Sequence, residues 1–434
     1  MKITLLNALS DREECINKDI MGGYGAATRI GNSFLAKLIE SRKKSGVKLP
    51  IFALGHIAAI LSNKGHQVEY KINEIPLDSD LILMPSSIVD HKIELEYAQK
   101  IKQQTKTIIG FIGPFASVQP ELYLKHADFV IKNEPEQIVM EIAEGKIPKG
   151  LVDSKPIQDL DTLPYPQWDI FPIEDYSYSP VINKKPFISI LSSRGCIFSC
   201  FYCPYKAYYG NWRLRTPENI VKEIKYLKDK FQIKGLLFRD PLFTYNKERA
   251  KQIAELIIKE DIDIEWACET HFDYLDANLI DILYKSGLRG LNVGIESTNQ
   301  EILQKAMRKS ATIEKQNEIV AYCHKKGIRV SAFYIFGLPD DTEESILKTI
   351  EYAKQLNTNV AQFFILTPFP GTPFYEKTKD KIYDTNFAHY DSYTPVIHHS
   401  KLTKEQLLKL KEKAFISYYF RPRYILKFLK NRIK

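Results

Sequence analysis

The feature that most constrains the fold is a regular alternation of short apolar runs with helical patterns, which occurs twice along the chain. In residues 1–145 the strand-like runs are Lys2–Ala8, Gln67–Ile72, Asp80–Ser87, Thr107–Gly113 and Phe129–Lys132. The helical patterns between them are Pro50–Asn63, Asp90–Gln104 and Glu134–Glu144. Alternating strands and helices predict a parallel sheet covered on both faces. We therefore expect a doubly wound α/β domain over residues 1–145.

The second alternation predicts a different α/β architecture. Its strand-like runs are Phe187–Ser192, Gly235–Arg239, Ile262–Cys268, Gly290–Glu296, Ile328–Phe336 and Val360–Leu366. Its helical patterns are Pro217–Lys230, Lys247–Lys259, Ala277–Ser286, Ile313–Lys326 and Thr342–Leu356. Short connections between them favour a partial (β/α)6 barrel over residues 186–390, in which chemistry belongs at the C-terminal ends of the strands.

Two further segments complete the predicted organisation. Residues 146–185 are rich in proline, which breaks long helices, and we interpret them as an ordered linker. Residues 391–434 are predicted as a helical tail, and its last fourteen residues, 421–434, carry six basic and no acidic side chains. Such a helix suits either an anionic membrane surface or a solvated position covering the barrel.

Composition limits the functional classes. The chain has 434 residues, with 61 Lys and Arg against 53 Asp and Glu, and this mild excess does not imply a nucleic-acid partner. The N-terminus lacks the charged and apolar regions of a signal peptide, and no apolar run is long enough to span a bilayer. We therefore expect a cytoplasmic protein, peripheral at a membrane if the basic tail binds one. Clustered cysteines in that reducing setting favour metal binding or catalysis over disulfides.

Three of the six cysteines, Cys196, Cys200 and Cys203, lie within eight residues directly after the first barrel strand. The CxxxCxxC spacing lets one loop wrap three thiolates around a polynuclear centre. Three thiolates on a four-iron cubane leave one iron free for a substrate or cofactor. The alternatives are a zinc site, which would need a distant fourth ligand such as His271, and unrelated core cysteines. Of the others, we expect Cys268 and Cys323 to be buried and Cys15 to be exposed.

The cysteine motif, with Tyr202 before the last cysteine, resembles that of the radical S-adenosylmethionine (radical SAM) superfamily. The resemblance implies that the three cysteines hold a 4Fe–4S cluster whose open iron is chelated by SAM. Reductive cleavage of SAM would then give a 5′-deoxyadenosyl radical. By the same resemblance, the residues that contact SAM are Tyr202 beside the adenine, Asp240 after the second strand, Glu296 after the fourth, and Gly337 in the turn after the fifth.

Most of the chain also resembles the cobalamin-binding subgroup of that superfamily. The resemblance is carried by Gly113–Ser117, Ala127–Ile131 and Asn133–Glu136, and by the aromatic and proline-rich segments around 164–168, 212–218 and 367–373. It implies a Rossmann-like cobalamin-binding domain, with contacting loops at Ser86, Ser87, Gly113 and Pro114. The sequence departs from the full pattern because it has no Asp-x-His-x-x-Gly motif to supply a histidine to cobalt.

These resemblances together imply an enzyme that transfers a methyl group to an unactivated carbon or performs a related radical rearrangement. Its expected partners are a small-molecule or lipid-linked substrate and an electron donor such as flavodoxin or ferredoxin, with no specific nucleic acid. One alternative is a cobalamin-independent radical SAM enzyme such as a methylthiotransferase, although the second N-terminal cysteine cluster expected of those enzymes is missing. An alternative of another class is a zinc-holding RNA-binding module.

Overall fold

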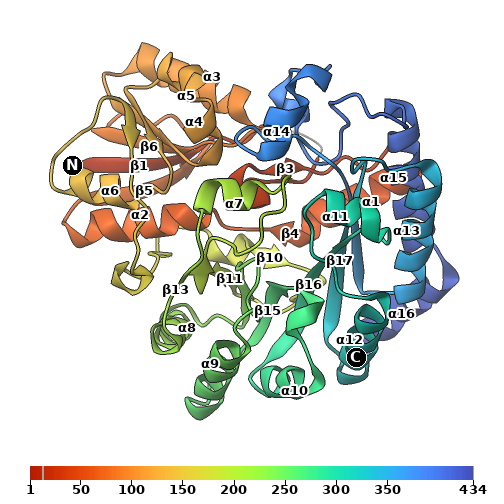
Figure 1. Ribbon diagram of the computed structural model, residues 1–434. Coiled ribbons are helices and arrows are strands. Elements are labelled where there is room, and N and C mark those ends of the chain that lie inside the picture. Colours follow the sequence, from red (N-terminus) through yellow and green to blue (C-terminus); the bar gives the residue numbers. More distant parts are fainter. Residues whose placement is uncertain (12–13, 434) are drawn as a thin grey trace.

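The computed structural model describes residues 1–11 and 14–433, and side chains as far as Lys427. Two parallel sheets organise the molecule, each of six strands in the described part of the chain (Figure 1). The N-terminal sheet lies at the upper left of the view, and the second sheet curves through the lower and right-hand parts. Both predicted architectures, a doubly wound α/β domain and a partial barrel, are confirmed.

The first sheet has the strand order β5-β1-β6-β7-β8-β9. Its strands are β1 (Lys2–Asn7), β5 (Gln67–Ile72), β6 (Leu81–Pro85), β7 (Ile108–Ile112), β8 (Phe129–Lys132) and β9 (Gly150–Asp153). Its helices are α2 (Phe52–Asn63), α3 (His91–Gln104), α4 (Pro114–Val118), α5 (Pro120–Leu124) and α6 (Glu136–Ala143). Every residue of β6 is buried, as expected of a strand covered on both faces. The last strand, β9, lies in the segment that we predicted to be a linker. The sequence did not predict this strand, because its four residues show no clear alternation of apolar and polar side chains.

The second sheet has the strand order β11-β14-β15-β16-β17-β18, so each strand pairs with the next strand of this sheet along the chain. Its strands are β11 (Phe187–Ile190), β14 (Gly235–Phe238), β15 (Glu265–Thr270), β16 (Leu288–Glu296), β17 (Arg329–Phe336) and β18 (Val360–Ile365). The helices outside it are α8 (Pro217–Phe231), α9 (Lys247–Lys259), α10 (Ala277–Lys285), α12 (Ile313–Lys326) and α13 (Glu343–Leu356). Local caps explain these helices: Thr216 caps α8 through Asn219 N–H, with Pro217 in the first turn. The strand β15 begins at Glu265, later than predicted. Ile262 and Ile264 gave the segment before it a strand-like apolar pattern, but these side chains are buried in the connection that precedes the strand.

Several short elements connect the two halves. Helix α1 (Phe34–Gly46) continues into β4 (Val47–Lys48), which pairs antiparallel with β10 (Ser177–Tyr178) just before the barrel begins. At the C-terminal end of the chain, α15 (Lys404–Tyr419) and α16 (Pro422–Ile433) pack beside β18. The sequence patterns did not predict α1. Its apolar residues Phe34 and Leu38 are exposed to solvent, so apolar and polar side chains do not separate onto two faces of this helix.

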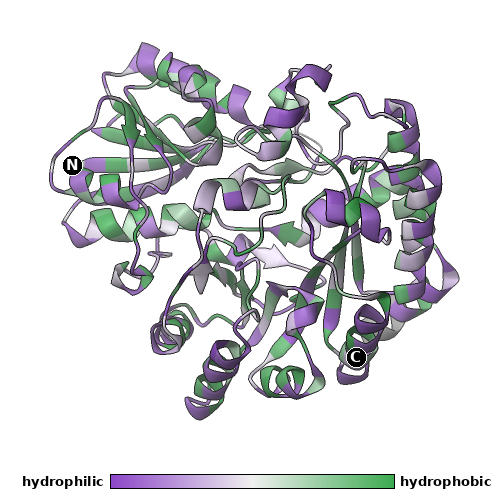
Figure 2. Ribbon diagram, in the orientation of Figure 1, coloured by the Kyte–Doolittle hydropathy of each residue, from purple (hydrophilic) through white to green (hydrophobic). Residues whose placement is uncertain are grey.

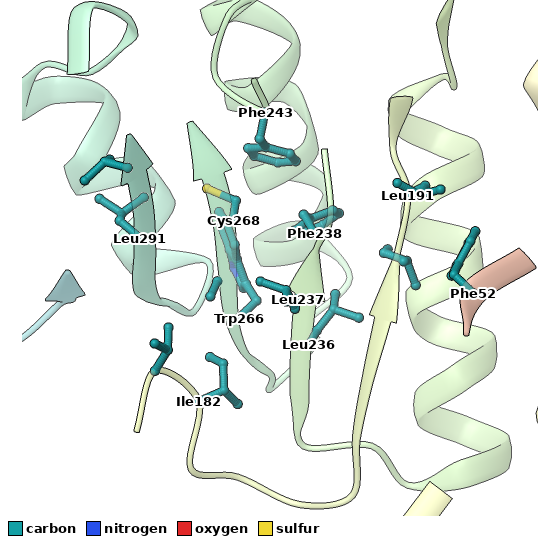
Figure 3. Packing of buried hydrophobic residues seen from close by; sticks show 14 of the residues in the cluster. Phe52, Ile182, Leu191, Leu236, Leu237, Phe238, Phe243, Trp266, Cys268 and Leu291 are labelled. Carbon is teal, nitrogen blue, oxygen red and sulfur yellow. The ribbon is translucent and has the colours of Figure 1, made fainter. Parts of the chain in front are cut away.

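The core is continuous between the two halves. Figure 2 shows mostly hydrophobic strands inside and hydrophilic outer faces on the surrounding helices. In Figure 3, Phe52 of α2 reaches the barrel beside Leu191, while Phe238, Trp266 and other side chains fill the space between the strands. Trp168 is also fully buried, so the proline-rich segment packs as part of the fold.

The isolated cysteines are all buried. Cys268 and Cys323 are buried as predicted, but Cys15 is only 3% exposed, so its predicted exposure was wrong. Its thiol accepts a hydrogen bond from the Asn17 amide at 3.3 Å, in a segment that packs against the rest of the chain. Within the described residues, no helix is long and apolar enough to cross a bilayer.

Candidate active site

The loop after β11 carries the three clustered cysteines and is held in one shape by close backbone contacts. Gly195 has φ +81°, and a β-carbon there would lie 2.0 Å from the Asn211 carbonyl oxygen. The Cys196 N–H donates to the Gly210 carbonyl at 3.3 Å. The Lys206 ammonium, on α7 (Pro204–Tyr209), donates to the Cys196 carbonyl at 2.7 Å. The loop therefore folds back on the helix that follows it.

The thiols of Cys196, Cys200 and Cys203 are free, the first buried and the others partly exposed. Burial raises the pKa of all three thiols, that of Cys200 to about 12, and the Arg308 guanidinium opposes the shift at each. No group of three or more His, Cys, Asp or Glu side chains in the described part of the chain is arranged to hold a single metal ion. Ligands of a polynuclear cluster, by contrast, each bind a different iron. Because burial disfavours the ionised form, a nearby cation and the charge of bound iron would both be needed to keep these cysteines as thiolates.

Glu296 lies at the end of β16, where the backbone turns sharply. Its φ is +63°, and the β16–β17 register shifts between Gly294 and Glu296. One carboxylate oxygen accepts from Arg308 Nε at 2.7 Å and from the Tyr202 hydroxyl at 3.4 Å. The other oxygen is buried and has no hydrogen-bond partner among the described residues. A strained residue with a free buried acceptor is typical of a ligand site, and an acceptor fits a ribose hydroxyl.

Asp240 and Gly337 take other positions. The carboxylate of Asp240 is fully buried and accepts from the Ser192 N–H and hydroxyl, both at 3.0 Å, so it supports the loop that leads to the cysteines. Gly337 has φ +81°, and its N–H donates to Asp341 in the turn after β17. Neither residue lines the cavity that lies beneath the cysteine loop, and the contact of each with SAM stays a prediction.

A cavity of about 820 Å³ lies inside the barrel beneath the cysteine loop. Tyr202, Cys203 and Glu296 line its upper part. Arg239 and Glu269, at the ends of β14 and β15, form a partly buried ion pair in its wall. The size is that of a site for one or more small molecules.

Asp19 brings the N-terminal half to the same wall. Its carboxylate faces Arg239 Nε at 3.4 Å, and its carbonyl oxygen accepts from Arg239 Nη2 at 2.7 Å. Burial raises the pKa of Asp19 and of Glu269, and Arg239 opposes both shifts.

The predicted cobalamin loops lie at the C-terminal edge of the first sheet. Ser86, Gly113 and Pro114 line a small pocket of about 40 Å³, whereas Ser87 points away and donates to Glu94 at 2.8 Å. Gly113 has φ +102°, and its α-carbon faces the Ser86 hydroxyl. Three residues line both this pocket and the large cavity, which makes the two spaces adjacent: Asp19, Gly23 and Tyr209.

A buried ion-pair network joins the two halves directly ahead of the cysteines. Arg194, in β12 (Ser193–Arg194), donates to Glu134 at 2.6 Å and to Glu136 at 2.7 Å. Arg213 forms a further pair with Glu134. Glu134 and Glu136 lie at the beginning of α6 in the N-terminal half, so this network fixes the cysteine loop against that half.

The comparisons agree with this geometry. The radical SAM superfamily model matches residues 190–353, which run from β11 into α13. An uncharacterised methyltransferase of Pyrococcus horikoshii, PH0819, is 30% identical over 79% of this chain and 78% of its own length. The chain belongs to the radical SAM superfamily. As a radical SAM enzyme it uses a 4Fe–4S cluster and SAM, and the predicted cluster ligands are its three loop cysteines.

Two solved structures share the fold of this radical SAM protein. The methyltransferase TsrM of Kitasatospora setae, with cobalamin and a [4Fe–4S] cluster bound, gives a TM-score of 0.63 at 17% identity, covering 88% of this chain and 78% of its own. The cobalamin-dependent enzyme OxsB, with aqua-cobalamin and SAM bound, gives 0.70 at 12% identity, covering 99% of this chain and 70% of its own. At these identities the likeness shows the common two-part fold.

The zinc alternative loses its support. His271, the fourth ligand required for the zinc alternative, has both ring nitrogens engaged, with the Lys309 carbonyl at 3.0 Å and the Asp273 N–H at 3.2 Å. Burial lowers its pKa to about 4. Family membership and this engaged histidine leave no basis for a zinc-holding RNA-binding module.

Sequence reasoning missed several site residues. Arg308 follows α11 (Gln300–Lys305) in a loop with another basic side chain, and no local signal distinguishes it. Arg239 precedes the chosen Asp240, and period-two alternation along β14 could have identified it as the residue that faces the barrel interior. Asp19 could not be identified, because its partner Arg239 lies 220 residues away.

Proposed function

We propose that this radical SAM protein is a cobalamin-dependent methyltransferase that acts on an unactivated carbon of a small organic molecule. The observation that carries the proposal is the adjacency of the two pockets. The cavity beneath the cysteine loop and the pocket at the cobalamin-type loops share Asp19, Gly23 and Tyr209 in their walls. A methyl donor held by the first sheet would therefore face the same space as SAM and substrate. PH0819 and TsrM, which are both described as methyltransferases, support the same chemistry.

The side chains at the upper end of the cavity suit SAM. When bound, the cluster and SAM supply an electron and a 5′-deoxyadenosyl radical that removes hydrogen, and cobalamin supplies the methyl group. Arg308 holds Glu296 by one hydrogen bond and the Gly294 carbonyl by another, at 3.0 Å. The free oxygen of Glu296 would then accept a hydrogen bond from a ribose hydroxyl of SAM. Burial of the site would keep water away from the reacting atoms.

The edge of the first sheet is where we place the cobalamin. Gly23, Ser86, Gly113 and Pro114 line the second pocket together with larger side chains such as Lys18 and Tyr209. At about 40 Å³ this pocket alone is far smaller than a corrin ring, so cobalamin would have to extend into the adjoining space. A β-carbon at Gly23 would lie 3.2 Å from the Pro114 ring, so a larger residue would enter this space. We assign the cobalamin contacts to these loops.

The proposal is tested by cofactor loading. Protein purified anaerobically and reconstituted with iron and sulfide is offered hydroxocobalamin, and metal content and visible spectra are recorded. We expect about four irons per chain together with stoichiometric cobalamin. Iron without cobalamin would instead support the cobalamin-independent alternative.

The cluster assignment has its own test. Cys200→Ala removes one of the three iron ligands, so we expect loss of iron and no 5′-deoxyadenosine after reduction in the presence of SAM. Cys323→Ala, at a buried thiol of α12 outside the loop, serves as the matched control and keeps both. Continued 5′-deoxyadenosine formation by Cys200→Ala would refute the assignment.

We further propose that the protein receives its electron from a flavodoxin or ferredoxin and binds anionic membranes through α16. That helix begins with exposed Arg423, Ile425 and Leu426 beside the barrel. Arg421 and Lys427 instead donate to the Asn357 side chain and carbonyl, at 2.6 and 2.7 Å, and the basic side chains after Lys427 lie beyond the part of the chain whose side chains are described. Membrane attachment would suit a lipid-linked substrate. Co-sedimentation with anionic liposomes at low salt tests it, and protein that stays wholly in the supernatant would overturn it.

A further inference from the structure

The large cavity continues down the barrel from the cysteine loop. Its wall includes Val360, Gln362 and Phe364, alternate residues of β18, and Leu366 beyond the end of that strand. Along an extended strand, the distance from residue 360 to residue 366 is ~20 Å. The cavity is therefore elongated, and only its upper end is next to the cysteines.

Apolar and aromatic side chains line this lower part. They come from β17, β18, α15 and α16, and they include Phe333, Phe364, Phe415, Tyr419 and Tyr424. Tyr424 donates its hydroxyl to the Asn359 carbonyl at 2.8 Å, which fixes the first turn of α16 beside the N-terminal end of β18. The C-terminal helices thus close the open edge of the partial barrel with an apolar wall.

The lower part has exposed residues at its rim. Leu38 and Arg42 of α1, Lys185 just before β11, and Ile425 of α16 all line the cavity while exposed to solvent. Lys185 lies just before β11, and Ile425 lies in the first turn of α16, which Tyr424 holds beside the N-terminal end of β18. A mouth therefore lies between α1 and α16, away from the cysteine loop.

Charge is distributed unequally along the cavity. The three acidic residues in its described wall, Asp19, Glu269 and Glu296, lie at the upper end near the cysteines. Arg42 and Lys185 lie at the mouth, and Lys43 between them and the interior donates to Gln362 at 3.0 Å. Arg239 pairs with Asp19 and Glu269, and Arg308 pairs with Glu296, so the upper end already holds its own counter-charges, whereas the cations at the mouth favour an anionic group there.

We propose that the substrate is an elongated, mainly apolar molecule with an anionic head group, which enters through the mouth between α1 and α16. Its apolar body lies along β17 and β18, its head group stays near Arg42, and its reacting carbon reaches the space below Tyr202. The inference rests on the proposed function, because it names the substrate class of the same cavity.

The test measures binding without turnover. Full-length, cluster-reconstituted protein is titrated by calorimetry with farnesyl diphosphate, farnesol and inorganic diphosphate, with no SAM or reductant present. We expect farnesyl diphosphate to bind at least tenfold more tightly than farnesol, and inorganic diphosphate alone to give no measurable binding. Because no methyl transfer is required, the result is independent of the methyltransferase proposal.

Variants locate the bound molecule. Arg42→Glu at the mouth should weaken farnesyl diphosphate binding at least tenfold, whereas Lys222→Glu, the same charge change at an exposed position of α8, should leave it unchanged. Val360→Trp should block the lower cavity and abolish binding, with iron content and circular dichroism as the check on folding. Absence of binding to the unaltered chain, or binding that Arg42→Glu leaves unchanged, would overturn the inference.

Discussion

At the residue scale, Arg308 is the side chain on which the SAM end of the cavity depends. Its guanidinium and the Glu296 carboxylate are 9% and 10% exposed, so each is the buried partner of the other. Burial opposes the charged form of Arg308, but Glu296 outweighs it and raises the pKa of Arg308. The same cation is near the cysteine thiols and favours their ionised form. One residue therefore positions Glu296 and compensates charge at the cluster.

Arg308→Gln should weaken both functions. Removing one partner of a buried ion pair costs about 3 kcal/mol of unfolding free energy, and we expect the affinity for SAM to fall about tenfold. Urea unfolding and equilibrium dialysis with SAM measure the two effects. Arg289→Gln is the control, because that guanidinium lies over the Tyr284 ring and donates to backbone carbonyls. Unchanged SAM affinity in Arg308→Gln would show that Glu296 does not depend on it.

At the scale of an element, the cysteine loop depends on backbone geometry as much as on its thiols. Gly22 of the N-terminal half also meets this loop, since a β-carbon there would lie 2.8 Å from the Tyr205 α-carbon. The glycine-rich segment around residue 22 therefore serves as a close contact between the halves. Spacing alone identified the three cysteines, but only packing explains why Gly195 precedes them.

Gly195→Ala should deform the loop. The left-handed φ costs about 1 kcal/mol for alanine, and the contact with the Asn211 carbonyl adds a direct overlap. We expect iron content after reconstitution to fall severalfold. Gly145→Ala, at φ +87° with no atom within 4 Å of the new β-carbon, carries the backbone strain without the overlap and should bind iron normally. Full iron content in Gly195→Ala would contradict this account.

At the scale of the whole molecule, the pairing of Arg194 with Glu134 and Glu136 joins the halves around the active site. Burial opposes ionisation of Glu136, but the Arg194 guanidinium outweighs it and holds the pKa of Glu136 below its ordinary value of 4.5. Because the folded pKa is depressed, the pair contributes its full stability above pH 4.5. That contribution is lost as the pH falls through the folded pKa.

Glu136→Gln should remove this pH dependence. Above pH 4.5 the variant should be less stable than the unaltered chain by about 3 kcal/mol, and the difference should shrink as the pH falls further. Urea unfolding at a series of pH values measures the difference in unfolding free energy between the variant and the unaltered chain. The titration of the other carboxylates is common to both proteins and cancels in this difference. Glu141→Gln on the same helix, where the carboxylate accepts from the neutral Gln137 amide at 3.4 Å, is the control. A difference that stays constant with pH would exclude the ion pair as its source.

The sequence by itself determined the two α/β architectures and predicted the three cysteines as the cluster ligands. Those features depend on local periodicity, on caps such as Thr216 and on the spacing of three cysteines within one loop. Tertiary structure alone decided the burial of Cys15, the addition of β9 to the first sheet, and the pairing of Asp19 with Arg239. It also created the cavity mouth and the pairing of Arg194 with Glu134. These contacts join residues far apart in the chain, so their energy appears only when packing brings the two halves together.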